Sequence, residues 1–561
     1  MNALSVAFKH TVKSSGSKQP QSTGEPMNVS LSPIGGVAGL FLDNSGKPLA
    51  GGLLYSYSAG TSTAQATYSD SNGATLQSNP IVLDSGGRVP NEIWLISDLS
   101  YTFVLKTSTG TLIGSWDNIT GICASTTLSA LGASAGSVLI GFLGAGAGAA
   151  ATTVQAKLRQ TINVKDFGAV GDGVSDDTAA IQKAVTYAFG AGCKIEIDGN
   201  GGEYTISTPI IYPAGSLVTL RNMKLVAAAC FDKSKYMVEV TSQKDGLCNH
   251  DLSFEDLIMD ASHRGGCLLV DNYIRVIVSN CTFLHFSTCG IRLDKTKDSH
   301  ECLISKVWAF EFLYGEPGFS TPTPSSTGLQ INSPDNEINQ YVSYYTGRGI
   351  VINAHYNLIS QAHVGCGIYA LYITQNAAWT SINQCYIDSA SVLWENPWNT
   401  EFSGCKFLTN TETASFAFVI IRPMAANTFM RGAKITQCSF HNMGSATVIS
   451  VKNDASSGWF DYANLRSNYI ENNSFNNTTE AYTRLRTSSY KAGASLWTFN
   501  LANYFPIGSI QKVTCSYYCK TSAIFPISVI TSISGTDVTV SNSIASNGTM
   551  FIDVDVNVSY S

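Results

Sequence analysis

The feature of this 561-residue chain that most constrains its fold is a six-residue word that recurs along its middle. The word reads apolar, polar, polar, small, any residue, apolar, as in Val278-Ser-Asn-Cys-Thr-Phe283. Periods of 20 to 35 residues are typical of stacked repeat units, and strands this short in such a stack predict a β-helix. The small fourth residue returns after 23, 20, 33 and 35 residues, at Ala362, Cys385, Cys405, Cys438 and Asn473.

The word also predicts which side chains point into the solenoid. Its first, fourth and sixth residues are expected to face inward, while the polar pair forms a corner. Small residues such as Cys, Ala and Val suit a narrow, stacked interior. Intervals near 20 residues leave room for three strands and their turns, so the intervals above 30 must contain loops that leave the solenoid.

Composition supports a β-rich, elongated architecture. Hydrophobic residues make up 44% of the chain and charged residues only 13%, whereas helical surfaces usually carry many Lys, Glu and Arg. The formal net charge of −6 provides no basic surface, so nucleic acid is not expected as a partner. An acidic polysaccharide is not excluded, because a local patch can oppose the net charge.

The 14 cysteines show no tight framework spacing and no recurring CxxC pair, which argues against both a disulfide scaffold and a zinc ribbon. We expect most of them to be reduced thiols in the core of a protein made in a cytosol, because free Cys behaves as a small buried hydrophobe. Cys515 and Cys519 lie close together in the sequence and are either a pair or ordinary strand residues.

Domain boundaries are predicted from changes in pattern. Residues 1–30 are polar and form an arm, and residues 31–125 form a compact β domain of short alternating strands. In this domain Asp43, Asp70 and Asp84 each lie beside Ser, Asn or Gly, as turn aspartates do. Residues 126–160 form a Gly/Ala-rich neck with a short amphipathic helix, and residues 161–488 form the β-helix. Residues 489–561, where the word disappears, form a small C-terminal β domain that caps the solenoid or clamps chains together.

Two segments have alternative interpretations. Residues 130–154 carry no charge, but Gly and Ala make them too weakly hydrophobic for a convincing membrane span. A close-packed junction between chains is the favoured interpretation.

Between Ile162 and Val185, the acidic residues Asp172, Asp176 and Asp177 lack the spacing of a calcium loop. Helix capping is favoured there, with an apolar stripe following at helical spacing.

The same segment carries a family resemblance. Val164-Lys-Asp-Phe-Gly-Ala-Val-Gly-Asp-Gly-Val-Ser-Asp-Asp-Thr-Ala-Ala-Ile-Gln182 resembles the entry motif of pectate-lyase-like β-helices in bacteriophage tailspikes, in which a helix caps the open end of the solenoid. Upstream, Pro33-Ile-Gly-Gly-Val-Ala-Gly-Leu-Phe-Leu-Asp-Asn-Ser-Gly46 and Asn79-Pro-Ile-Val-Leu-Asp-Ser-Gly-Gly-Arg-Val-Pro90 resemble the virion-binding head domain of the same proteins. The resemblance covers residues 31–230, and beyond them only the repeat pattern supports it.

The resemblance and the repeat together give the expected fold: all-β, a right-handed single-stranded parallel β-helix with an N-terminal β head-binding domain and a small C-terminal β domain. The resemblance implies a homotrimer located in the tail of the virion. Its N-terminal domain would dock on a phage tail or portal-associated structural protein. Its solenoid would bind bacterial surface polysaccharide, O-antigen or capsule. No cofactor and no membrane span are expected.

Glycoside cleavage needs two carboxyl groups flanking the scissile bond and benefits from aromatic faces against which sugar rings lie. Three windows combine acids with aromatic residues. The first holds Asp388, Glu395 and Glu401 with Trp394 and Trp398; the second holds Trp308, Asp335 and Glu337; the third holds Trp459 and Tyr462. The five acids are the catalytic candidates and the five aromatic residues are the substrate-binding candidates, although surface acids and aromatic residues also occur on any β-helix.

Three functions therefore compete. The first is a tailspike depolymerase, an endo-glycosidase that hydrolyses the polysaccharide during adsorption. The second is a non-catalytic receptor-binding or structural tail protein that uses the β-helix as a rigid spacer. The third is a polysaccharide lyase. His355, His363 and His441 are interpreted as packed or surface residues, and the alternating stripe of Asp553, Asp555 and Asn557 as the solvated face of a sheet, so no metal is expected.

Overall fold

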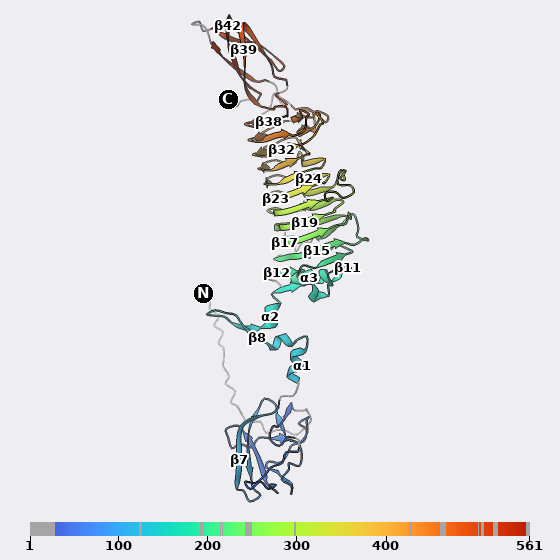
Figure 1. The fold of residues 1–561 in the computed structure, drawn as a ribbon, viewed down its shortest axis with the longest axis vertical. Helices are drawn as coiled ribbons and strands as arrows, with labels where there is room; N and C mark the ends of the chain where they lie inside the picture. The colour runs from blue at the N-terminus through green and yellow to red at the C-terminus, as the bar shows by residue number, and fades with distance from the viewer. Residues whose placement is uncertain are drawn as a thin grey trace, which may run out of the picture. The chain divides into compact units, whose positions relative to one another are not determined.

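A computed structural model of the chain describes two compact units, Met1–Leu158 and Arg159–Ser561 (Figure 1). Each is treated by itself. The described residues are 28–36, 38–122, 126–190, 194–213, 215, 217–241, 249–296, 299–426, 429–460, 467–502, 504–506, 510–519 and 526–556.

The first unit begins with a small β domain around a core that includes Leu54, Ile93 and Phe103. The aspartates expected in turns are there: the side chain of Asp43 accepts hydrogen bonds from Ser45 N and Lys47 N at 2.8 and 2.9 Å. Asp70 and Asp84 bind turn amides in the same way. Its strands are β1 (Val29–Leu31), β2 (Leu53–Ser58), β3 (Thr67–Tyr68), β4 (Ile81–Val82), β5 (Trp94–Ile96), β6 (Ser100–Lys106) and β7 (Leu112–Thr120), in sheets β1-β5-β3 and β4-β2-β6-β7.

The neck consists of short elements without a large core of their own. It contains α1 (Thr126–Gly132), η1 (Gly136–Leu139), β8 (Gly141–Leu143), β9 (Ala151–Thr153) and α2 (Val154–Leu158). Large apolar side chains along it are exposed, including Leu139, Leu143 and Leu158. In the part of the chain that the structure describes, no helix is long and apolar enough to cross a membrane.

The second unit opens with β10 (Thr161–Asn163), η2 (Val164–Phe167), β11 (Asp172–Asp176) and α3 (Thr178–Gly190). The predicted apolar stripe of α3 is buried, from Ile181 to Ala188. Asp176 caps the helix as expected, because its carboxylate accepts from Thr178 N at 3.1 Å. The expectation for Asp177 was wrong: its carboxylate instead holds the preceding glycine-rich loop by accepting from Val170 N and Gly171 N at 2.7 and 3.1 Å.

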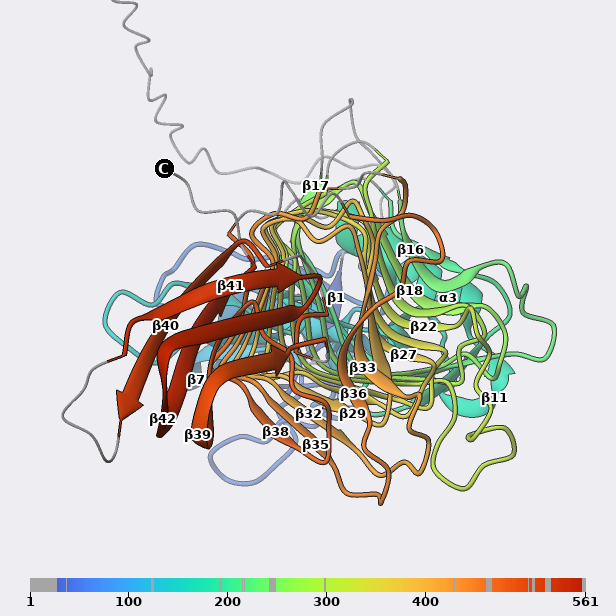
Figure 2. The ribbon, with the colours of Figure 1, turned by 90° about the horizontal axis from the view of Figure 1, so that it is seen from above.

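The solenoid is a right-handed parallel β-helix whose strands stack in three columns. Viewed along the stack, β29, β32, β35 and β38 overlie one another on one face and β18, β22, β27 and β33 on another (Figure 2). We name the columns A, B and C in the order in which each coil visits them. All strand pairs in the three columns that the structure describes are parallel, and the bounds of the strands follow.

Column A contains β10, β12 (Ile195–Asp198), the first halves of β15 (Val218–Ala227), β17 (Asn249–Asp260), β19 (Tyr273–Leu284), β21 (Leu303–Phe310) and β23 (Glu337–Tyr344), then β25 (Leu358–Ser360), β28 (Ser381–Asn383), β31 (Glu401–Ser403), β34 (Lys434–Thr436) and β37 (Tyr469–Glu471). Column B contains β11, β13 (Glu203–Ile206), the second halves of the same five strands, then β26 (His363–Gly365), β29 (Tyr386–Asp388), β32 (Lys406–Thr409), β35 (Ser439–Asn442) and β38 (Ser474–Asn476). Column C contains β14 (Ile210–Ile211), β16 (Tyr236–Val240), β18 (Gly266–Asp271), β20 (Cys289–Asp294), β22 (Thr327–Ile331), β24 (Arg348–Ile352), β27 (Tyr369–Ile373), β30 (Ser391–Glu395), β33 (Ala417–Arg422) and β36 (Ile449–Asn453).

The six-residue word is the corner between columns A and B. Its third residue adopts a left-handed backbone, with φ of 53° at Asn280, Lys306, Gln361 and Gln384. One left-handed residue between two extended segments turns the chain sharply and leaves both segments free to pair with the next coil. The polar pair therefore forms the corner, as predicted.

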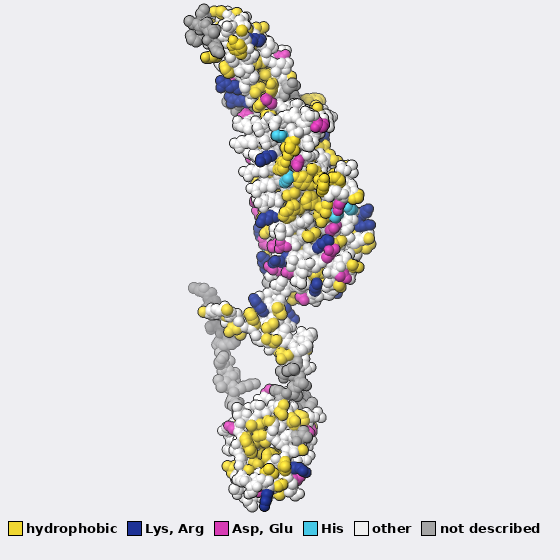
Figure 3. All heavy atoms as spheres, viewed as in Figure 1, with side chains coloured by type: hydrophobic (Ala, Val, Ile, Leu, Met, Phe, Trp, Pro, Cys, Tyr) yellow, Lys and Arg dark blue, Asp and Glu magenta, His cyan; other side chains and the backbone are white. Residues whose placement is uncertain are grey.

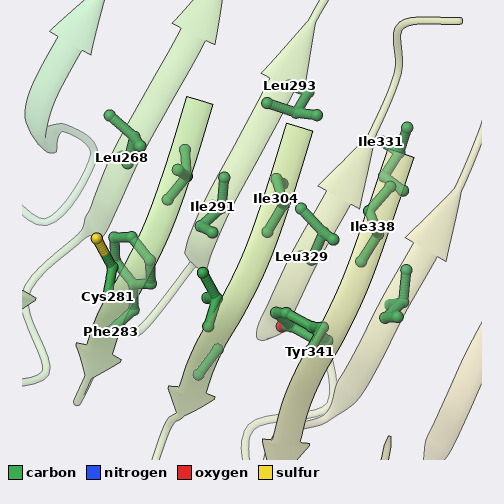
Figure 4. Packing of buried hydrophobic residues seen from close by; sticks show 14 of the residues in the cluster. Leu268, Cys281, Phe283, Ile291, Leu293, Ile304, Leu329, Ile331, Ile338 and Tyr341 are labelled. Atoms are coloured by element: carbon green, nitrogen blue, oxygen red, sulfur yellow. The ribbon is translucent and has the colours of Figure 1, made fainter. Parts of the chain in front are cut away.

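The inward positions of the word form the core. Val278, Cys281 and Phe283 are fully buried, and the corresponding residues of the words up to Ile435–Phe440 are at most 2% exposed. Figure 4 shows this packing, in which Ile304 and Ile338, paired in register, lie on successive strands. The 11 cysteines among the described residues are free thiols, as expected for most of them. Cys515 and Cys519, for which a pair was the alternative, are ordinary residues of a strand and are not bonded to each other.

The C-terminal sheet is antiparallel and begins at Arg484, five residues before the expected boundary. It contains β39 (Arg484–Asn500), β40 (Lys512–Cys519), β41 (Ser528–Ser534) and β42 (Asp537–Asp555), and β42 pairs with the other three. Its own core includes Trp497, Met550 and Ile552. Asp553 lies on the partly exposed face, 3.8 Å from Arg486, and Asn557 lies outside the described residues.

The narrow interior predicts a cost for enlarging a corner residue. Cys405→Leu should lower the free energy of unfolding by about 1–3 kcal/mol, because the thiol is only 1% exposed in the core and a larger side chain there must displace its neighbours. Urea unfolding followed by circular dichroism measures the change. The exposed Cys230→Leu serves as the control, and an equal loss in both variants would contradict the account.

Candidate functional site

The outer face of column B carries the densest set of chemical groups on the solenoid. Because side chains alternate along a strand, the fifth residue of each word faces outward between two buried ones. Parallel pairing then aligns these residues from coil to coil, roughly 4.8 Å apart. The resulting row runs Thr282, Trp308, Val342, His363, Tyr386, Lys406 and Ser439.

A second outward row lies two residues further along each strand. It runs Asp260, Leu284, Phe310, Tyr344, Gly365, Asp388, Leu408 and His441. Gly365 is required here, because a Cβ at this position would collide with the backbone carbonyl oxygen of Asp388. No side chain therefore stands between Tyr344 and Asp388 in this row.

The two rows meet in a cluster that we call the central cluster: Tyr344, His363, Tyr386 and Asp388. The Tyr344 hydroxyl hydrogen-bonds to His363 Nε2. The His363 ring stacks on Tyr386, with ring centroids 4.2 Å apart and planes 16° from parallel. Asp388 is half-buried, and Ser389 Oγ donates to its carboxylate at 2.8 Å.

Burial and the charge of Asp388 set the protonation of this cluster. Burial, with a further contribution from the Asp388 charge, raises the pKa of the Tyr344 hydroxyl. Burial also lowers the pKa of His363 below its ordinary value, although Asp388 opposes the shift. At neutral pH the imidazole is therefore mostly uncharged. In the tautomer that carries its proton on Nδ1, the Tyr344 O–H donates and His363 Nε2 accepts.

A shallow groove of 750 Å³ continues along column B from the central cluster. Lys406 supplies an exposed ammonium group beside Tyr386, and His441 lies at the far end, where Asn476 Nδ2 contacts His441 Nδ1 at 3.2 Å. The groove is lined by Gln384, Cys385, Tyr386, Gly404, Lys406, Phe407, Leu408, Ser439 and His441.

Aromatic rings extend the same face in the other direction. Tyr314 is 81% exposed and packs edge-on against Phe319, with centroids 5.4 Å apart. Phe319 in turn packs edge-on against Tyr345, which touches Tyr344. Figure 3 shows a hydrophobic patch over the middle coils of the solenoid, with histidine beside it. The face thus presents ring surfaces next to a carboxylate, an imidazole and an ammonium group.

A second acidic cluster anchors the loop that follows β21. His285 Nδ1 lies 2.9 Å from Asp260, and His285 Nε2 lies 3.2 Å from Glu316 on the loop. The hydrogen bond to Asp260 is the main cause of a raised pKa for His285, and the charges of both carboxylates add to it. Glu311, which is 1% exposed, accepts from Thr323 N at 3.1 Å. These contacts hold the loop against column B.

The first predicted window does not form one site. Asp388 faces outward on column B, Glu401 lies on column A, and Glu395 belongs to column C. Glu395 is only 5% exposed and accepts a hydrogen bond from the Tyr372 hydroxyl at 2.7 Å. Because the coil turns between these residues, the three carboxylates lie on three faces of the solenoid, although they are close in the sequence.

The two tryptophans of that window differ in burial. Trp394 is fully buried against Phe402 in the core, with ring centroids 5.4 Å apart. Its prediction as a substrate-binding residue is therefore wrong: its position in β30 points inward. Trp398 is 46% exposed and lies at the corner before column A, near Glu401.

The second window is likewise separated by the coil, and the third is described only at Trp459. Trp308 is 37% exposed on column B, whereas Glu337 is exposed at the start of column A and Asp335 occupies the left-handed corner before it. Trp459 is exposed on a loop, and Tyr462 lies outside the described residues. The structure therefore brings Trp308 and Asp388 to one face and leaves the other described candidates elsewhere.

Tyr344, His363, Tyr386 and Lys406 were missed by the search for acids with neighbouring aromatic residues. The signal for three of them is in the word, because His363, Tyr386 and Lys406 each hold its fifth position. Comparing this position between coils, and not within one window, would have placed them in a row.

Across the described parts of the chain, no group of three or more His, Cys, Asp or Glu side chains is arranged to hold a metal ion.

Comparison with known proteins gives one family match and several partial relatives. A family model described as rhamnogalacturonase A/epimerase, pectate lyase-like, matches residues 161–218. Polygalacturonase QRT3 of Arabidopsis thaliana is 26% identical over 427 residues, which are 70% of this chain and 84% of that protein.

Mannuronan C5-epimerase AlgE2 of Azotobacter vinelandii is 48% identical over 66 residues, which are 12% of this chain and 6% of the epimerase. The alignment with this relative thus spans only a small part of its length. Among solved structures, a tailspike protein of E. coli bacteriophage HK620 aligns with a TM-score of 0.45 and 10% identity, over 78% of this chain and 100% of that chain.

The His285 cluster predicts a pH-dependent stability. Because Asp260 raises the pKa of His285 above its unfolded value of about 6.5, the protonated ring stabilises the fold fully below that pH. The contribution is lost as the pH rises through the raised pKa. His285→Gln should therefore destabilise the protein more at about pH 5 than at about pH 9, by on the order of 0.5–1 kcal/mol for a partly exposed pair.

Thermal or urea unfolding at the two pH values measures this difference. His355→Gln is the control, since the hydrogen bond of His355 to Ala378 N involves no carboxylate. If His285→Gln instead lowers the free energy of unfolding more at the higher pH, the fold holds the neutral form of the His285 ring and the prediction is wrong.

Proposed function

We propose that this chain is a receptor-binding tail protein of a bacteriophage that binds bacterial surface polysaccharide along column B and cleaves it there. The observation that carries the proposal is the central cluster with its groove: rings for sugar stacking lie in line with Asp388, His363 and Lys406 on one face. The tailspike motifs between residues 31 and 182 support the attachment to a virion. The names of the sequence relatives, a polygalacturonase and an epimerase of mannuronan, support a polysaccharide as the ligand.

The proposed reaction is hydrolysis of a glycosidic bond within the chain. Asp388 accepts a proton from the water that bonds to the anomeric carbon, the glycosidic C–O bond breaks, and the Tyr344 hydroxyl donates its proton to the oxygen of the leaving sugar. Proton exchange with solvent then restores Tyr344 and Asp388. In the outward row of Asp388, the nearest other described carboxylate is Asp260, five coils or roughly 24 Å away. This distance exceeds the spacing of about 5–10 Å between paired glycosidase carboxylates, so Asp388 acts here with the Tyr344–His363 pair.

A second candidate reaction is β-elimination at a uronic acid unit. Lys406 favours it, because an exposed ammonium group beside the central cluster can neutralise the sugar carboxylate while a neighbouring base removes the adjacent proton. Elimination leaves an unsaturated product that absorbs ultraviolet light, whereas hydrolysis does not. One absorbance measurement on the digest separates the two reactions.

The proposed assembly is a homotrimer. The neck supports it: Leu139, Leu143 and Leu158 are 58%, 65% and 67% exposed, and a stretch with no charged residue between Asp117 and Lys157 allows identical chains to approach without repulsion. Three parallel copies would present equal polysaccharide sites, so that weak individual contacts combine. The N-terminal unit is proposed to dock on a structural protein of the tail.

Asp388→Asn should leave the fold intact and reduce turnover at least 100-fold, the smallest loss usually seen when a general base is removed. The assay incubates purified protein with capsular and O-antigen polysaccharides and measures released oligosaccharides by size-exclusion chromatography. Glu255→Gln, an isosteric change on column A, is the matched control.

Each outcome of this assay has a definite meaning. Loss of cleavage in Asp388→Asn alone supports the active site on column B. Equal cleavage by Asp388→Asn and the unmodified protein rejects that site. Binding of a polysaccharide by the unmodified protein without any shortening of the polymer would favour the non-catalytic adhesin.

A further inference from the structure

Three exposed aromatic residues at successive corners before column A belong to no part of the central cluster. Tyr356, Trp379 and Trp398 are 52%, 42% and 46% exposed. Tyr356 stacks on Trp379, with centroids 5.3 Å apart and planes 20° from parallel. Trp379 lies against Trp398 with centroids 5.1 Å apart. We call these three rings the corner platform.

The backbone fixes the position of the platform. Tyr356 and Trp379 occupy left-handed corners, with φ of 58° and 50°, a conformation that is rare for bulky residues. Tyr356 N donates to Ala378 O at 3.0 Å, and Trp379 N donates to Trp398 O at 3.3 Å. Corners of other coils share this backbone, but here successive coils place aromatic rings on it.

One amide holds both indoles. With its side-chain oxygen oriented toward them, Asn399 accepts from Trp398 Nε1 at 3.1 Å and from Trp379 Nε1 at 3.2 Å. Gly432 leaves room for this amide, since a Cβ there would collide with the Asn399 side chain. The polar edges of both indoles are therefore bound to the protein, and the rings are held in place before any ligand arrives.

A polar hollow of 390 Å³ adjoins the platform, lined by Trp379, Ser381, Asn399, Glu401, Gly432 and Lys434. Lys434 Nζ lies 3.6 Å from Glu401, and Ser381 Oγ donates to Glu401 at 3.1 Å. Both charged side chains remain partly exposed, 44% for Lys434 and 37% for Glu401. The hollow thus offers a donor, an acceptor and no net charge.

We propose that the corner platform and its hollow form a second, non-catalytic saccharide-binding site for neutral sugar units. The apolar face of a sugar ring lies on the platform, as sugars do on aromatic residues, while its hydroxyls bind Glu401, Lys434 and Ser381. Because the ion pair neutralises itself, the hollow has no excess charge to select an acidic sugar. Preorganised rings lower the entropy lost on binding.

A second copy of the chain fits this surface less well. Charged residues are depleted at the centres of protein interfaces, whereas a Glu–Lys pair lies in the middle of this hollow. The site lies on column A, and the proposed cleavage site on column B, so the two are separate. A chain with both would hold the polymer on one face while cleaving it on another.

The test measures retention of the protein on an array of immobilised O-antigen and capsular polysaccharides. The Trp379→Ala/Trp398→Ala double variant and Lys434→Gln should each lose at least tenfold in affinity for polymers with neutral units, as expected when aromatic anchors are removed. Tyr490→Ala, which removes a ring 57% exposed on the C-terminal sheet, is the control. Circular dichroism and the unfolding midpoint confirm that each variant is folded, and Lys434→Gln tests the site without removing a ring.

Asp388→Asn separates this proposal from the proposed function. If Asp388→Asn loses cleavage and keeps retention, while the platform variants lose retention, both sites are supported. Unchanged retention in the folded platform variants overturns the second site and leaves the cleavage site untouched. Retention of no neutral polysaccharide by the unmodified protein also overturns it, as does a platform variant that changes only the oligomeric state in light scattering, which would assign the surface to contact between copies.

Discussion

Parallel hydrogen bonding between successive coils is the constraint on which the rest of this structure depends. Each coil pairs with the next in register along three columns, and this fixes the direction of every side chain in the solenoid. A left-handed corner residue and a small buried neighbour make the pairing possible, as Gln384 and Cys385 do. Without the corner, the strands of columns A and B could not both remain in the stack.

The same pairing decides which side chains lie next to one another on the surface. Equivalent positions of distant coils come to lie roughly 4.8 Å apart, so that His363, Tyr386 and Lys406 form a row although about 20 residues separate each from the next. A polymer lying along such a row meets one side chain per coil. The solenoid is therefore suited to long, repetitive ligands, for which many modest contacts add together.

The three columns also divide the roles of the surface. Column B combines rings with a carboxylate, an imidazole and an ammonium group, while the corner before column A presents rings beside a neutralised ion pair. Column C carries Glu395, which Tyr372 binds and solvent barely reaches. Glu395 therefore links two adjacent coils through this hydrogen bond, although Trp394 and Trp398 lie beside it in the sequence.

The sequence by itself determined the β-helix, its inward positions and its corners, because the repeated word encodes local backbone conformation and burial, and both are set by neighbouring residues. It also placed the turn aspartates and the helix α3. Only the tertiary structure decided which acids and rings share a face. Asp388, Glu395 and Glu401 are close along the chain yet separate in space, since each coil turns through three faces within about 20 residues, and the neighbours of Asp388 come from other coils whose register no single window contains.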